Sequence, residues 1–102
     1  MFGIFKKKKN LHADLEKIEN EINEMSVNEL MNIMMKISNI ESLDLKDLKK
    51  HTFILIVLTL KEMNYEIHVN DLDIEKNRDF TIAIDDCACR IRDNIMDRII
   101  NT

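Results

Sequence analysis

The residues best suited to chemistry are gathered in one short stretch, residues 85–89, which reads Asp-Asp-Cys-Ala-Cys. Thiolates and carboxylates of this kind are common metal ligands. Cys87 and Cys89 lie two residues apart, however, and on a helix their side chains point about 200° away from each other. Two thiols also fall short of the four ligands of a structural zinc site, and no Cys or His pair elsewhere completes the set. We therefore expect free cysteines, no metal site and a reducing, cytoplasmic environment.

The three histidines, His12, His51 and His68, are scattered along the chain. None stands beside a serine or cysteine with a third residue to orient it, as a nucleophilic triad requires. The only glycine is Gly3, so the chain has no glycine-rich loop to cradle a phosphate or a dinucleotide. The pattern indicates no catalytic residues and no cofactor, and we expect a non-enzymatic protein.

The elements that would position any site are organised around residues 53–60, a long run without a charged side chain. Read as a helix, this run places apolar residues all round its axis, which is typical of a helix enclosed by others. Residues 26–29, Ser-Val-Asn-Glu, fit a capping box that starts another helix. With one Gly and no Pro in 102 residues, the composition favours helices over hairpins.

We predict a single all-α domain over residues 10–102, a small four-helix bundle with a buried central helix. The helices are expected at residues 10–25, 27–40, 45–64 and 79–100, the third of them at the centre. Short connections predict that sequential helices run antiparallel. The longest apolar run has eight residues, too few for the ~20 of a membrane-spanning helix.

An α+β fold with a short hairpin at residues 65–84 is the alternative. Near both ends of this segment apolar residues alternate with polar ones, at the period of two that a strand requires. The alternating residues are Tyr65, Ile67, Val69, Phe80, Ile82 and Ile84. The apolar spacing from Ile84 to Ile99 is helical, which favours the bundle.

Charge is distributed unevenly. Residues 6–9 are four consecutive lysines, and without them the chain carries 11 basic and 19 acidic side chains, a net charge of −8. An acidic body disfavours nucleic acid, whose phosphates require clustered Lys and Arg. We interpret residues 1–9 as a flexible basic tail. An alternative for this tail is weak contact with a membrane surface through Phe2, Ile4, Phe5, Lys6, Lys7, Lys8 and Lys9.

Residues 41–44, Glu-Ser-Leu-Asp, resemble the Asp-Ser-Leu motif of acyl carrier proteins, in which the serine carries phosphopantetheine at the start of a helix. Residues 65–71 are similar to the acidic loop that follows that helix, and residues 80–85 to the start of the last helix of the family. The resemblance covers under a fifth of the chain, without the glycine usual before the serine. It implies an alternative function, that of a divergent acyl-carrier-like protein with Ser42 as its prosthetic-group site.

The clearest amphipathic stripe has apolar spacings of four, three, four and three. It consists of Leu11, Leu15, Ile18, Ile22 and Met25. The stripe spans barely two heptads, too few for a coiled coil, so it either lies on the core of the domain or pairs with another helix.

Four helices leave a central helix that is apolar on all sides only partly covered, so apolar surface should remain. We predict a homodimer with Leu15, Ile18 and Ile22 as the contact row. The expected function is that of a small acidic adaptor, inhibitor or immunity-type protein that binds a protein partner through an acidic helical face.

Overall fold

The computed structural model describes residues 10–68 and 78–101. These form α1 (Leu11–Glu24), α2 (Val27–Ser38), the 3-10 helix η2 (Leu45–Asp47), α3 (Leu48–Glu62) and α4 (Arg78–Ile100). No strand occurs in this part of the chain, and the predicted all-α bundle is confirmed. With η2 counted as the start of α3, every helix lies within two residues of its predicted bounds. The basic tail, residues 1–9, lies outside the described residues.

Short polar side chains set the starts of three of these helices. Ser26 Oγ accepts a hydrogen bond of 3.1 Å from the amide of Glu29, which is the serine half of the predicted capping box. Asn10 Oδ1 accepts one of 3.1 Å from the amide of Ala13 at the start of α1, and Asp44 caps η2. Each of these bonds satisfies an amide that has no partner within its own helix. The helix starts therefore follow from contacts within three residues.

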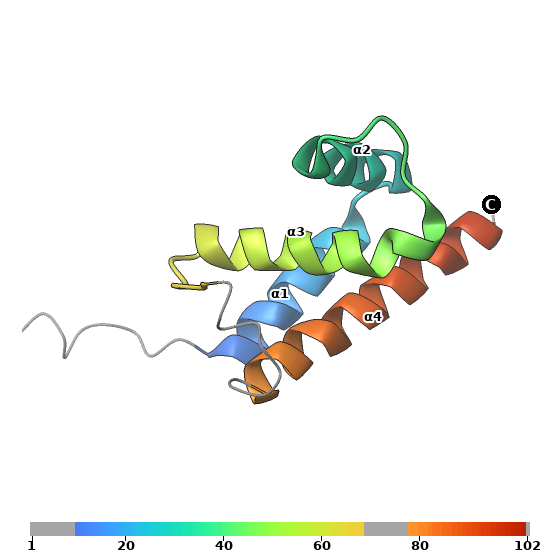
Figure 1. Cartoon of the computed structure of the whole chain (residues 1–102). Coiled ribbons are helices and arrows are strands. Elements are labelled where there is room, and N and C mark those ends of the chain that lie inside the picture. The colour runs from blue at the N-terminus through green and yellow to red at the C-terminus, as the bar shows by residue number, and fades with distance from the viewer. Residues whose placement is uncertain (1–9, 69–77, 102) are drawn as a thin grey trace, which may run out of the picture.

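Helices α1 and α4 lie side by side and run in the same direction (Figure 1). Arg90 Nε lies 3.0 Å from Glu19 Oε1, and Arg98 Nη1 donates to the carbonyl oxygen of Met25 at 2.5 Å. The residue numbers in these two contacts rise together, as a parallel pair requires. Helix α3 runs in the opposite direction and crosses both (Figure 1).

Helix α2 corrects the expectation that sequential helices run antiparallel, because it runs in the same direction as α3 (Figure 1). Asn39 ends α2 in the left-handed conformation, with φ of 54°. Its amide donates to the carbonyl of Lys36, and the amide of Ile40 donates to that of Met35, which satisfies the end of the helix. Residues 39–44 then lead the chain back along α2. Six residues reach about 20 Å, enough to return along a helix of about 18 Å.

The alternative hairpin at residues 65–84 is wrong for the described part of that segment. Residues 65–68 form no strand, and Phe80, Ile82 and Ile84 lie on α4. Ile84 is buried whereas Ile82 is 37% exposed, so the two do not share one face as a strand would require. The helical spacing from Ile84 onward prevails because it covers more than four turns. Val69 lies outside the described residues.

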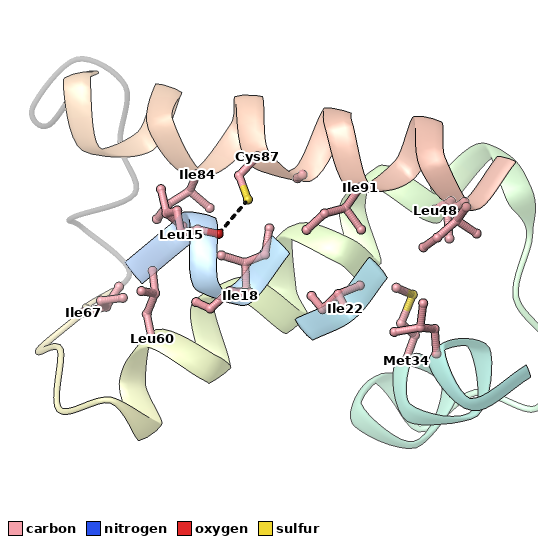
Figure 2. Close-up of a cluster of buried hydrophobic side chains, with 14 residues drawn as sticks. Leu15, Ile18, Ile22, Met34, Leu48, Leu60, Ile67, Ile84, Cys87 and Ile91 are labelled. Carbon is pink, nitrogen blue, oxygen red and sulfur yellow. Dashed lines mark hydrogen bonds between the residues drawn. The ribbon is translucent and has the colours of Figure 1, made fainter. Parts of the chain in front are cut away.

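The core lies between α4 and the other three helices (Figure 2). Helix α4 contributes five fully buried apolar side chains, namely Ile84, Cys87, Ala88, Ile91 and Ile95. Helix α3 contributes a single fully buried row, namely Leu48, Thr52, Ile56 and Leu60. The expectation that α3 is enclosed on all sides is therefore corrected. Its row has a spacing of four throughout, which marks one face of a helix.

Candidate functional site

The row predicted to contact a partner lies in the core of the single chain. Leu15, Ile18 and Ile22 are 3%, 2% and 5% exposed. Figure 2 shows their side chains on α1 among those of α3 and α4. A partner could reach this row only after α1 had left the domain. Of the two roles that the α1 stripe allowed, packing on its own core is the one observed.

Apolar surface remains instead on the side of α3 that faces away from the core. We call Lys50, Ile54, Leu58 and Lys61 the outer row. Their spacings of four, four and three place them on the helix face opposite the buried row. Leu58 is 38% exposed, Ile54 is half-buried, and neither belongs to the core cluster or to the side chains packed against it. The carboxyl-terminal end of α3 extends past α2 (Figure 1).

A groove of about 440 Å³ adjoins the outer row where α3 meets α4. It is lined by Lys46, Lys49, Lys50, Phe53, Ile54 and Asp85. Two of these residues, Lys50 and Ile54, also belong to the outer row, so the groove and the row form one continuous surface. This surface combines apolar side chains with lysines, and Asp85 is the carboxylate at its wall.

The lysines of this surface differ in how they are neutralised. Lys49 Nζ lies 3.0 Å from Asp85 Oδ1, and this hydrogen bond and charge raise the pKa of Lys49. Lys46 lies 3.6 Å from Asp44 in an exposed pair. Lys50 and Lys61 form no ion pair with any carboxylate of residues 10–68 and 78–101. The outer row therefore carries an unneutralised ammonium group at each end.

A serine and a histidine meet in a contact that sequence reasoning missed. Ser38 Oγ lies 2.9 Å from His51 Nδ1, across the contact between α2 and α3. Ser38 is the last residue of α2, where the helix dipole is negative. A catalytic serine needs positive potential for its oxyanion, so this pair has the wrong polarity for acyl transfer. We interpret it as a link between the two helices. No sequence signal could have found it, because 13 residues separate the partners.

Ser42, the predicted prosthetic-group site, lies in the connection between α2 and η2. Its side chain is exposed, three residues before η2 begins. A transferase could reach this hydroxyl. Of the second segment of the carrier resemblance, residues 65–68 are described, and residues 69–71 lie outside the described part.

Cys87 and Cys89 both lie on α4, so their side chains diverge and each has its own environment. Cys87 is fully buried, with its Sγ 3.8 Å from the carbonyl oxygen of Leu15. Burial, and then the charge of Glu19, raise the pKa of the Cys87 thiol to about 11. Cys89 is half-buried on another face. In the described part of the chain, no three His, Cys, Asp or Glu side chains group closely enough to hold a metal ion.

A larger hollow of about 690 Å³ lies where the start of α2 meets the end of α4. It is lined by Ser26, Val27, Asn28, Asp97, Arg98, Ile99 and Asn101. Its charges are of both signs, and Arg98 is engaged with the carbonyl oxygen of Met25. This hollow shows no preference for a ligand of either charge, whereas the surface on α3 does.

The chain matches no protein-family model, no curated protein and no solved structure. In the part of the chain that the structure describes, no helix has both the length and the apolar character needed to cross a membrane. Function is therefore inferred from the surfaces of this chain itself.

Proposed function

We propose that this chain is a non-enzymatic protein-binding module of the adaptor, inhibitor or immunity type, acting in the cytosol, and that it binds through the outer row of α3. The observation that carries the proposal is the outward position of Ile54 and Leu58 beside a groove. Single exposed apolar side chains are ordinary, but contiguous ones beside a hollow are typical of interfaces. Binding is thus assigned to α3, in place of the acidic helical face expected from the net charge.

The outer row lies on a helix that the core holds in place. The opposite face of α3 is held by four fully buried residues, and Thr52 within it donates its hydroxyl to the carbonyl oxygen of Leu48 at 2.7 Å. A partner therefore meets a helix that is already ordered, and binding carries little entropic cost of folding. An exposed helix face beside a groove suits a helical partner, which can lay its own apolar side against it.

Affinity capture with a matched control tests the proposal. Leu58→Asp places a charge on the outer row, while Ile82→Asp places one at a site on α4 with nearly the same exposure, 37% against 38%. We expect proteins that are retained by the wild type and by Ile82→Asp to be lost with Leu58→Asp. Circular dichroism should show both variants folded. A set of captured proteins that is the same for all three chains would contradict the proposal.

The homodimer stays a prediction, and its contact row has to change because Leu15, Ile18 and Ile22 are buried. The outer row is an exposed apolar surface that could replace it. A twofold pairing about the midpoint of this row sets the Lys50 ammonium of each copy opposite the Lys61 ammonium of the other, which weakens the contact. Light scattering at micromolar concentration measures the outcome, and a 12.1 kDa particle would exclude the dimer.

An acyl-carrier-like function is the second candidate, supported by the exposure of Ser42 ahead of a helix. Incubation with a phosphopantetheinyl transferase and coenzyme A, followed by mass spectrometry, tests it. An adduct that is lost in Ser42→Ala would establish the carrier function. An unmodified chain would remove it.

A further inference from the structure

We propose that the partner presents an acidic amphipathic helix, and that this helix lies along the outer row with one apolar side chain in the adjoining groove. This inference rests on the proposed function, since it names the chemistry of the partner at the same surface. The features that carry it are the spacing of the charges, their freedom from neutralisation, and the apolar side chains between them.

The charge spacing defines the partner. Lys50 and Lys61 are 11 residues apart, which is about 16 Å along α3 and only about 20° around its axis. The apolar side chains of Ile54 and Leu58 lie between them on the same face. A partner helix of about four turns with a carboxylate near each end of an apolar stripe matches this arrangement. Both ends of the row are cationic, so the partner can lie in either direction.

The sign of the charge contrasts with the rest of the molecule. Two of the four lysines at this surface are neutralised, Lys46 by Asp44 and Lys49 by Asp85, which leaves the ammonium groups of Lys50 and Lys61 on a chain whose net charge is −4. Two other carboxylates, Asp47 and Glu62, lie in the same stretch, and neither pairs with Lys50 or Lys61. Complementary potential accelerates association and excludes partners of the wrong sign. The two unpaired lysines of the outer row therefore select an acidic partner.

The groove provides an anchor point. Phe53 and Ile54 form apolar walls within a volume of about 440 Å³, enough for one large side chain. Lys49 is already neutralised by Asp85 at 3.0 Å, so it frames the groove without competing for the carboxylates of the partner. Lys46 and Lys50 remain at its edge. Most of the binding energy of an interface comes from a few anchors in well-packed pockets, surrounded by contacts that exclude water.

Two other occupants fit less well. A second copy would bring Lys50 and Lys61 together as like charges. An anionic membrane would accept the lysines, but it would be repelled by a chain whose residues 10–102 carry a net charge of −8. Both occupants are outcomes of the experiment below.

The test uses a designed helical peptide of about 15 residues, with two leucines one turn apart between glutamates 11 residues apart. A second peptide carries lysines in place of the glutamates. Titration into ¹⁵N-labelled full chain should shift the amide resonances of Lys50, Ile54, Leu58 and Lys61 with the glutamate peptide only. Raising the salt from about 0.05 to 0.5 M should weaken binding several-fold. Equal binding of both peptides would overturn the inference.

Charge reversal in the outer row is compared with the same change elsewhere on the surface. Lys50→Glu/Lys61→Glu should lose at least about tenfold in affinity for the glutamate peptide and gain affinity for the lysine peptide. Lys17→Glu/Lys36→Glu makes the same change at exposed lysines of α1 and α2 and should leave both affinities unchanged. An equal loss in the two double variants would contradict a local effect and overturn the inference.

Two further experiments distinguish the acidic helix from a membrane and from a second copy of the chain at this surface. Vesicles of phosphatidylserine and phosphatidylcholine should leave the chain in the supernatant, and sedimentation that is abolished by Lys50→Glu/Lys61→Glu would assign the surface to a membrane and overturn the inference. A dimer abolished by Leu58→Asp would likewise assign it to a second copy. If captured proteins depend on Leu58 but not on Lys50 and Lys61, the proposed function stands and only the acidic partner fails.

Discussion

Helices α1 and α3 both carry apolar rows, but the fold places these rows in opposite environments. Ile18 on α1 is 2% exposed, while Leu58 on α3 is 38% exposed. Helix α1 has one apolar stripe on an otherwise charged surface, and that stripe is needed for the core. Helix α3 is apolar on two faces, and packing on neighbours uses only one of them. Apolar surface is therefore left on α3, which has more apolar residues than the core can accept, and not in the apolar row of α1.

The largest expected effect on stability comes from truncating a side chain in the buried row of α1, compared with one in the outer row of α3. Ile18→Ala removes a buried side chain that cannot be replaced by solvent, and it should lower the free energy of unfolding by about 2–5 kcal/mol. Ile54→Ala removes the same atoms from the outer row and should change it by at most about 0.5 kcal/mol. Urea denaturation measures both. Equal losses would show that the two rows are not different in burial.

Alkaline pH should lower the stability of the fold through Cys87, whose thiol on α4 lies against α1. Burial raises the pKa of Cys87 from 9.0 to about 11, so the folded chain holds this proton more tightly than the unfolded chain does. The stabilisation is complete below pH 9 and is lost as the pH rises through 11. Arg90 opposes the shift and Glu19 adds to it. Burial also raises the pKa of Tyr65, from 10.0 to about 12, with a contribution from its hydrogen bond to Asp14.

Urea midpoints measured at several pH values between 7 and 11 test this prediction. Cys87→Ala should show a smaller loss of stability between pH 9 and 11 than the wild type, because it lacks the thiol that titrates. Cys89→Ala retains the buried thiol and should follow the wild type. A steep loss of the same size in Cys87→Ala would contradict the assignment.

The hydrogen bond between Ser38 of α2 and His51 of α3 should contribute less to stability than the buried side chains do. Ser38→Ala removes the hydroxyl that lies 2.9 Å from His51 Nδ1, and loss of one partly buried hydrogen bond should cost about 1 kcal/mol. Ser42→Ala is the control, since its side chain is exposed. It should unfold at the same urea concentration as the wild type. A larger loss for Ser42→Ala would place that residue in an undetected structural role.

The smallest expected effect on stability concerns a charged residue of the outer row. Lys61→Ala removes the charge at one end of the outer row, where no described carboxylate pairs with it, and stability should change by no more than about 0.5 kcal/mol. Thermal unfolding should leave Tm nearly unchanged, while affinity for the glutamate peptide falls. A clear loss of stability would show that Lys61 supports the fold itself.

Features that depend on a few neighbouring residues were predictable. The predicted cap at Ser26 formed, with the Glu29 amide donating to its Oγ, and the helical spacing after Ile84 overrode the alternation that favoured a hairpin. Features that depend on which helices pack together could not be predicted. The contact between Ser38 and His51 joins two helices across 13 residues, and the direction of α2 depends on the path taken by residues 39–44.

The sequence alone determined that this chain is helical, roughly where its helices begin and end, and that its apolar residues exceed what four helices can bury. Those properties follow from backbone hydrogen bonds, side-chain caps and periodicity, all of which act over a single turn. Only the tertiary structure decided that the row of Leu15, Ile18 and Ile22 is buried while Ile54 and Leu58 face outward. Several apolar faces compete for one small core, and the outcome depends on the packing of all four helices at once.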